Sequence, residues 1–285
     1  MDPTSLSILL AVLLLVFLAL GLWIALAMLL VAAIAVVFFT STPPGALLAT
    51  TVWAQSTEWA LTALPLFVWM GEILFRTKLA DDMFNGLAPW VARLPGRLVH
   101  VNVLGCGLFA AVSGSSTATT ATIGRINLIE LRKRGYRDSI VLGSLAGSGT
   151  LGILIPPSII MIVYGVAADV PITHLFIAGV LPGILLMALF SGYIIGHALL
   201  APDQYPAAGP SMTFLEKLHL SRRLIPIAGL ILGVIGSIYF GIATATEAAG
   251  VGVLGALVIA WASGTLTWET FRLSVATATR TNCMI

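Results

Sequence analysis

Two short apolar arms stand out in the pattern of hydrophobic and polar positions along the chain. Residues 98–112 and 117–129 form the arms, and Ser113-Gly114-Ser115-Ser116 joins them. A helix needs ~20 apolar residues to cross ~30 Å of hydrocarbon, and neither arm reaches that length. We therefore expect a re-entrant helical hairpin over residues 98–130, which enters and leaves a membrane on the same side.

Basic residues flank both ends of this predicted hairpin. They are Arg76, Lys78, Arg93 and Arg97 before it, and Arg132, Lys133, Arg134 and Arg137 after it. Short loops rich in Lys and Arg stay on the cytoplasmic side, so both flanks belong on the same face of the membrane. A single continuous helix through both arms would place these clusters on opposite faces.

The N-terminal part of the chain, residues 1–78, is predicted to form apolar helices. The run 5–39 would extend ~50 Å as one straight helix, so it has to tilt, break or fold back, with Gly21 as a candidate position for a break. The apolar stretch that follows ends near Phe75, and we expect a kink in it at Pro65.

The remaining pattern predicts several further membrane segments. In chain order they are an amphipathic interfacial helix over 79–97, the hairpin over 98–130, a broken helix over 139–168, a transmembrane helix over 174–199, a cytoplasmic linker over 200–223, two transmembrane helices over 224–262 and a final segment over 263–285.

The composition fixes the class of protein. With 59% hydrophobic residues, 9% charged residues and a mean hydropathy of +1.04, a chain of 285 residues is not a soluble domain. We predict an all-α polytopic membrane protein whose surroundings are lipid. The formal net charge of +2 arises in the predicted cytoplasmic loops and gives no support for nucleic-acid binding.

Glycines and prolines interrupt the predicted helix over 139–168. They are Gly147, Gly149, Gly152, Pro156 and Pro157. The two prolines remove amide donors, so an undisturbed helix cannot continue through them. In hydrocarbon, an unwound stretch persists only where protein, water or an ion satisfies its backbone groups. Na⁺ prefers oxygen ligands, which backbone carbonyls here and hydroxyls at the hairpin tip supply.

The hairpin tip carries the matching chemistry. Ser115, Ser116, Thr117 and Thr119 place hydroxyl groups on it or just beyond it, and Gly114 permits close backbone approach. A half-helix beginning near Ser116 would point its positive dipole end into the site, which suits an anionic substrate. Discontinuous segments of this kind mark the binding sites of many secondary transporters.

Simpler interpretations of these features remain open. Small hydroxylated residues also let membrane helices approach and hydrogen-bond, and a double proline is also a structural kink between packed half-helices. Glu72 and Arg76 have the spacing of a helical ion pair. Glu247 follows Thr244 at the spacing of a capping box, which favours helix capping over proton transfer. An intramembrane serine hydrolase would need a base beside the tip, and His100 lies at the far end of the arm.

Four motifs in order resemble one known family. They are Val112 to Gly124 with the downstream Leu131 to Tyr136, Gly149 to Ser158, Phe176 to Gly183, and Thr246 to Ala249. Together they resemble the large membrane subunit, DctM type, of TRAP (tripartite ATP-independent periplasmic) transporters. The resemblance implies no enzymatic activity and an elevator fold of the ion-transporter superfamily, with the hairpin and the broken helix in its first inverted repeat.

The resemblance also implies a function. Such a protein performs sodium-coupled uptake of small organic acids, such as C4-dicarboxylates or sugar acids, in a bacterial or archaeal inner membrane. Its partners are a small four-helix membrane subunit and a periplasmic solute-binding protein, and Na⁺ is the coupling ion, with no other cofactor. The implied ion- or substrate-binding residues are Ser113, Gly114, Ser115, Ser116, Thr117, Thr119, Gly149, Thr150, Gly152, Ile155, Pro156 and Pro157. Of these, Ser115, Ser116, Gly149, Thr150 and Gly152 are proposed to frame Na⁺.

The family pattern has two inverted repeats, whereas residues 224–262 here only open the second one. We therefore expect a C-terminally truncated subunit that lacks the second hairpin and the second broken helix. The alternative is a non-transporting fragment, or an assembly or channel-like subunit without the second half of the site.

Overall fold

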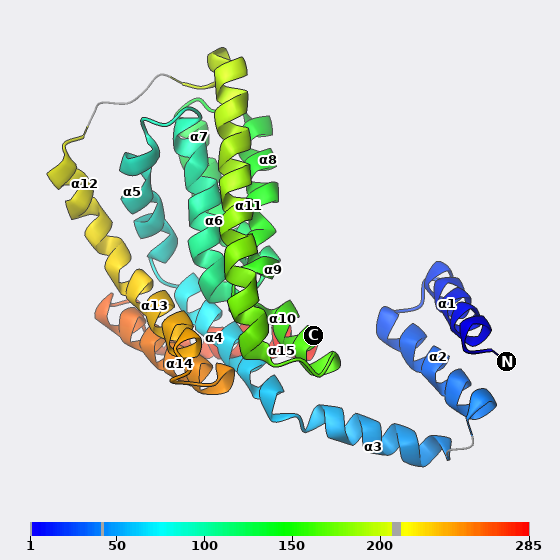
Figure 1. Cartoon of the computed structure of the whole chain (residues 1–285). Coiled ribbons are helices and arrows are strands. Elements are labelled where there is room, and N and C mark those ends of the chain that lie inside the picture. The colour runs from blue at the N-terminus through cyan, green and yellow to red at the C-terminus, as the bar shows by residue number, and fades with distance from the viewer. Residues whose placement is uncertain (1, 41–42, 207–211, 285) are drawn as a thin grey trace. The chain divides into compact units, whose positions relative to one another are not determined.

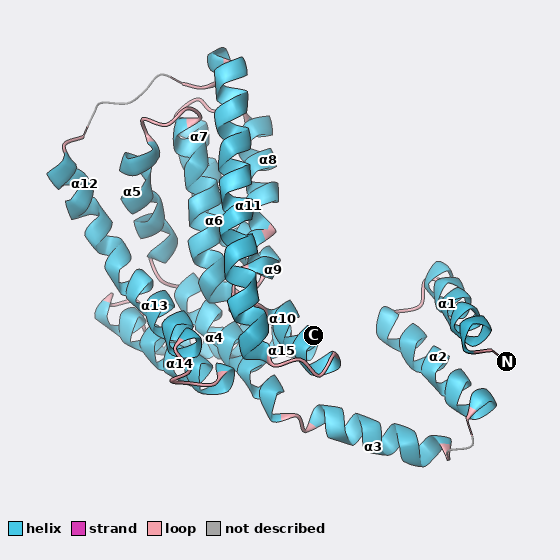
Figure 2. Cartoon of the chain, in the orientation of Figure 1, coloured by secondary structure: helices cyan, strands magenta, loops and turns pink. Residues whose placement is uncertain are grey.

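The computed structural model describes residues 2–40, 43–206 and 212–284, and every regular element in these ranges is a helix (Figure 2). The chain divides into two units, Met1–Glu58 and Trp59–Ile285. Several of its helices are apolar and long enough to cross a membrane, so the predicted all-helical membrane class is confirmed.

In the described residues of the first unit, 2–40 and 43–58, there are three helices, α1 (Pro3–Ala19), α2 (Ile24–Phe39) and α3 (Pro44–Ser56). The run 5–39 is therefore two helices, and α1 packs against α2. Gly21 lies between them with a φ of 79°, a conformation that favours glycine. The chain folds back at the position that the sequence offered as a candidate break.

The described part of the second unit contains the remaining α-helices. They are α4 (Ala63–Phe75), α5 (Leu79–Val91), α6 (His100–Ser113), α7 (Ser116–Lys133), α8 (Asp138–Gly149), α9 (Leu151–Leu154), α10 (Ile159–Ala167), α11 (Ile172–Leu200), α12 (Phe214–Ser221), α13 (Ile225–Tyr239), α14 (Ala245–Ala262) and α15 (Trp268–Met284). A short 3-10 helix, Trp59–Thr62, precedes α4.

Two groups of helices form within this unit (Figure 1). In one group α14 and α15 pack on α4, and in the other α6, α7, α8, α9 and α11 pack together. The groups meet where α4 contacts α6 and α10. The core of the contact is tight because a Cβ atom added at Gly71 would lie 3.0 Å from Ser113 Cα.

Three helical segments in the described residues are long and apolar enough to cross a membrane, namely Ile172–Leu200, Phe214–Tyr239 and Ala245–Ala262. The segment Asp138–Leu154 with Ile159–Ala167 also passes this test and bends by 40° at its break.

The position of Pro65 corrects the sequence analysis, which predicted a kink at this residue. Pro65 lies in the first turn of α4, where its missing N–H removes no helical hydrogen bond, and the interruption falls at Thr57 and Glu58 instead.

The predicted polar linker over 200–223 is shorter than expected. Thr213 caps α12 in a capping box with Glu216, and the helical segment then runs on to Tyr239. Helix α5 lies against its first half: Trp90 Nε1 donates to Ser221 Oγ at 2.7 Å, and Arg223 Nη1 lies 3.2 Å from Asp82 Oδ1. Part of the predicted linker, residues 207–211, lies outside the described residues.

Residues 79–97 and 263–285 also differ in detail from the sequence analysis. Helix α5 ends at Val91, before the end of the predicted interfacial helix. The final segment, to which the sequence analysis assigned no element, contains the 17-residue helix α15, which packs on α4.

Candidate functional site

The hairpin tip is a tight turn between α6 and α7. Helix α6 ends at Gly114, which adopts the left-handed conformation with a φ of 59° that non-glycine residues rarely take. Ser115 then caps α7, and its Oγ accepts from the amide of Ala118 at 3.4 Å. The Ser-Gly-Ser-Ser sequence thus ends one helix and begins the next within two residues, as the predicted hairpin requires.

The broken helix unwinds between α9 and α10. Ile155 and Ser158 have extended backbones, and the Pro156–Pro157 peptide bond between them is cis. The Ile155 amide still donates to Leu151 O at 2.8 Å, and Ser158 Oγ donates to Ile153 O at 2.6 Å. The break therefore falls at the predicted Pro-Pro position, and a side chain from its far end stabilises the last turn of α9.

The tip and the break lie against each other, backbone to backbone. The Ile159 amide donates to Gly114 O at 3.2 Å. A Cβ added at Gly114 would lie 2.6 Å from Pro157 O, and one added at Gly152 would lie 2.7 Å from Ser115 O and from the Ser116 amide nitrogen. Real Cβ atoms do not approach this closely, so both positions need glycine.

Gly149 makes a third close approach, to the Thr120 side chain on the second arm of the hairpin. The structure thus brings together eight of the predicted site residues: Ser113, Gly114, Ser115, Ser116, Gly149, Gly152, Pro156 and Pro157. Pro156 and Pro157 are buried and also line a small apolar pocket with residues of α11 and α13.

The other predicted residues lie around this contact with local partners. Thr119 Oγ1 lies 2.7 Å from Ser113 Oγ, and both are buried. Thr117 Oγ1 lies 3.1 Å from Ser115 Oγ. Thr150 is exposed and donates to Gly147 O at 2.6 Å, within its own turn. Ile155 faces Gly183 on α11 rather than the tip.

A buried polar network holds both hairpin arms on α8. Asn127 Nδ2 donates to Asn102 Oδ1 at 2.8 Å, and Asn102 Nδ2 donates to Ser144 Oγ at 2.8 Å. Both asparagines are at most 2% exposed. The sequence analysis missed this network, although two asparagines at corresponding positions of apolar arms were a usable signal because buried amides need partners.

A pocket of about 380 Å³ lies beside the tip. Its lining comes from α4, the hairpin, α10 and α15: Val68, Gly71, Glu72, Phe75, Arg76, Phe109, Ser113, Ser115, Thr117, Ala118, Ala121, Ile159, Thr277 and Thr281. The predicted tip residues Ser113, Ser115 and Thr117 face this pocket, and the sequence analysis did not anticipate that α4 and α15 complete it.

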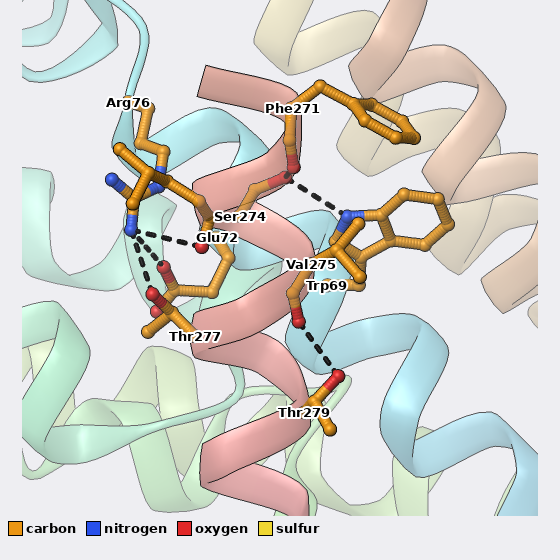
Figure 3. A network of polar contacts seen from close by, with 9 residues as sticks. Trp69, Glu72, Arg76, Phe271, Ser274, Val275, Thr277 and Thr279 are labelled. Carbon is orange, nitrogen blue, oxygen red and sulfur yellow. Dashed lines mark hydrogen bonds and ion pairs between the residues drawn. The ribbon is translucent and has the colours of Figure 1, made fainter. Parts of the chain in front are cut away.

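Polar contacts join α4 to α15 beside this pocket (Figure 3). The predicted ion pair is confirmed, because Arg76 Nη2 lies 3.5 Å from Glu72 Oε2. The same nitrogen donates to Thr277 Oγ1 at 2.9 Å, and Trp69 Nε1 donates to Ser274 Oγ at 3.1 Å. These contacts set which face of α15 meets the pocket.

The structure also settles the role of Glu247. Thr244 Oγ1 accepts from the Glu247 amide at 3.3 Å, and Glu247 Oε2 accepts from the Thr244 amide at 2.8 Å. The predicted capping box at the start of α14 is confirmed.

The fold and site define a multi-pass helical membrane protein with a helical hairpin docked on an interrupted helix. Residues 11–285 match the family described as tripartite ATP-independent periplasmic transporter, DctM component, and the chain belongs to this family. The predicted family is confirmed. Its curated members are transporter permeases rather than enzymes.

Three curated relatives illustrate the range of the family. The ectoine/5-hydroxyectoine TRAP transporter large permease protein UehC of Ruegeria pomeroyi is 36% identical over 70% of this chain and 46% of the relative. The C4-dicarboxylate TRAP transporter large permease protein DctM of Pseudomonas aeruginosa is 36% identical over 72% and 47%. The sialic acid TRAP transporter large permease protein SiaM of Vibrio cholerae is 32% identical over 76% and 49%. The chain spans about half the length of these relatives.

Proposed function

We propose that this chain serves as the large transmembrane subunit of a binding-protein-dependent TRAP system, which takes up small organic acids such as C4-dicarboxylates or sugar acids with sodium. The family membership and the functions given in the names of the relatives support this proposal. The proposed location is the inner membrane. The proposed partners are a small four-helix membrane subunit and a periplasmic solute-binding protein.

The observation that carries the proposal is the contact between the hairpin tip and the helix break. Two half-helices, α7 and α10, begin there, and the unwound residues 155–158 lie against the tip. Half-helix ends and unwound carbonyls at one place are the elements from which secondary transporters build ion and substrate sites. Coordination of Na⁺ by Ser115, Ser116, Gly149, Thr150 and Gly152 stays a prediction.

Sodium-dependent stability tests the ion site. We expect the purified chain to unfold at a higher temperature in Na⁺ than in K⁺ at equal ionic strength, because an ion that binds only the folded state stabilises it. The double variant Ser115→Ala and Ser116→Ala should lose this difference. Ser237→Ala is the matched control, since Ser237 Oγ donates within its own helix to Val234 O at 2.8 Å, away from the tip.

Equal unfolding temperatures in the two salts for the unsubstituted chain would refute the ion site. The same conclusion follows if the double variant keeps the full sodium response. Uptake itself is tested in proteoliposomes that contain the permease completed to the length of its relatives, the small subunit and a cognate binding protein. No uptake under an inward sodium gradient in this complete system would contradict the proposed coupling.

We also propose that transport involves an elevator motion, in which the two helix groups slide where α4 meets α6. A Cβ on Gly71 would lie 3.6 Å from Ser113 Cβ, within the range that a disulfide spans. In a background without Cys106 and Cys283, Gly71→Cys with Ser113→Cys should cross-link on oxidation, stop uptake and recover it on reduction. Each single cysteine variant is the control. Full uptake by the cross-linked protein would exclude motion at this contact.

A further inference from the structure

The second arm of the hairpin carries one charged residue. It is Arg125, the only Asp, Glu, Lys or Arg between residues 117 and 129, and its side chain is exposed. Arg125 lies in α7 seven residues before Arg132, which is ~10 Å along the helix axis. A charged side chain that faces hydrocarbon is costly, and charged residues of membrane segments therefore mark water-filled passages or binding sites.

The basic residues at the C-terminal end of α7 have acidic partners. Arg132 Nε lies 2.7 Å from Asp138 Oδ1. Lys133 Nζ lies 3.1 Å from Glu130 Oε1. By contrast, Arg125 makes no ion pair and no side-chain hydrogen bond with any residue that the structure describes. Its guanidinium group is therefore available to an anion from outside the chain.

An exposed ridge of α7 connects Arg125 to the pocket beside the tip. Thr117, Ala121 and Arg125 are exposed and lie four residues apart, so they follow one ridge of the helix. Thr117 and Ala121 line the pocket of about 380 Å³. Side chains of an α-helix leave it tilted toward its N-terminus, so that of Arg125 begins in the direction of Ala121. A side chain that reached lipid headgroups beside Arg132 would have to turn back along the helix.

We propose that Arg125 binds the carboxylate of a small organic acid that moves between this pocket and the predicted cytoplasmic end of α7. The inference rests on the proposed function and adds one binding position to the path of its solute. A guanidinium group donates two parallel hydrogen bonds to a carboxylate, and its charge raises the local concentration of anions. Arg125 thus favours acids over uncharged solutes of the same size.

The first test measures the electrostatic potential beside Arg125. In a background without Cys106 and Cys283, the Ala121→Cys chain in lipid nanodiscs is modified by an anionic and by a cationic methanethiosulfonate. Residues 121 and 125 are ~6 Å apart along the axis, where one charge in water changes each rate about threefold at ~0.01 M salt. Because the two reagents respond in opposite directions, Arg125→Gln should lower the ratio of the anionic to the cationic rate about tenfold.

Two variants and one change of salt separate this effect from a change of fold. Arg125→Lys keeps the charge and should keep the ratio. Arg132→Gln is the matched control, because Arg132 is already paired with Asp138 and lies ~17 Å from residue 121 along the same helix. It should change the ratio less than about twofold. In ~1 M salt the difference between Arg125 and Arg125→Gln should largely disappear, which a structural change would not do.

Protection by succinate tests the binding of a carboxylate. Methyl methanethiosulfonate carries no charge, so its rate at Ala121→Cys reports only whether a ligand covers the site. Succinate should slow this reaction, and 1,4-butanediol, its uncharged analogue, should not. Arg125→Gln should raise the succinate concentration for half-maximal protection about tenfold, the change expected for one charged hydrogen bond.

Three results would each overturn the proposal. The ridge faces lipid if Ala121→Cys reacts with the uncharged reagent but with neither charged one. Arg125 lies away from the path if Arg125→Gln leaves the ratio of rates unchanged. Arg125 does not bind the solute if succinate gives no protection or protects the Arg125→Gln chain equally well. Protection that depends on Arg125, combined with no uptake by the complete system under a sodium gradient, would instead contradict the proposed function alone.

Discussion

The contact between the hairpin tip and the helix break depends on the absence of one methyl group at Gly152. A Cβ there would lie 2.7 Å from Ser115 C, from Ser115 O and from the Ser116 amide nitrogen. Carbon contacts are favourable at about 3.5–4.0 Å, so the Gly152→Ala variant has to open the contact by about 1 Å. All three atoms belong to the backbone, so no side chain can rotate away to make room.

The expected loss of stability in Gly152→Ala follows from comparison with the same substitution at a second glycine on the broken helix. Gly143 in α8 has no atom within 4 Å of its hypothetical Cβ. An Ala in a helix is favoured over Gly by about 0.5–1 kcal/mol, so Gly143→Ala should stabilise the chain slightly. Gly152→Ala gains a similar amount but also overpacks the contact, which typically costs about 1–3 kcal/mol. That cost is the expected difference between the two variants.

Equilibrium unfolding of the purified chain in denaturing detergent, with and without Na⁺, measures both effects. We expect Gly152→Ala to be less stable than Gly143→Ala by about 1–3 kcal/mol, the overpacking range, and to need more Na⁺ for half-maximal stabilisation. If the two variants are equally stable, the close contact between tip and break is wrong. If stability falls but the sodium response is unchanged, the contact is structural and the ion lies elsewhere.

Three further substitutions test other parts of the fold. Asn102→Ala removes two hydrogen bonds of the buried network and should lower the free energy of unfolding by about 1–2 kcal/mol, a range typical of polar contacts between membrane helices. Thr244→Ala removes the cap of α14 and should cost about 1 kcal/mol in the same assay. Tyr136→Phe leaves the buried Leu98 amide without its acceptor, a loss of about 1–3 kcal/mol. Burial raises the pKa of Tyr136 above its ordinary value, so the contribution of the neutral phenol to the free energy of unfolding is complete below about pH 10 and is lost as the pH rises further. In pH-jump unfolding, the stability of the Tyr136→Phe variant should therefore depend less on pH above about pH 10 than that of the unsubstituted chain. An unchanged stability in any of these variants would contradict the contact it removes.

The site could be predicted from sequence where its chemistry is local. Gly114 ends a helix by its own backbone freedom, and Pro156 and Pro157 end one by removing amide donors. Neither effect depends on the rest of the fold. The hairpin followed from the length of its arms and the charge at their ends, which are also properties of short segments.

The remaining features depend on contacts between distant segments. Arg76 and Thr277 are 201 positions apart, and no local pattern indicates which face of α15 meets α4. The helix that begins at Phe214 was missed for a different reason. Lys217, Arg222 and Arg223 suggested a polar loop, whereas the Thr213 and Glu216 spacing was a capping signal that outweighed them.

Ser115 connects the proposed sodium site to the pocket beside the hairpin tip. Its backbone packs on Gly152 at the helix break, and its hydroxyl lines the pocket beside Glu72 and Arg76. A change in the position of the tip on the break therefore moves an atom of the pocket wall by a similar distance. If Na⁺ fixes the tip and a solute in the pocket contacts the same residue, each ligand binds better to the arrangement that the other favours. By linkage, Na⁺ must then raise the affinity for a solute in the pocket by the same factor as the solute raises the affinity for Na⁺, and Gly152→Ala should reduce both factors together.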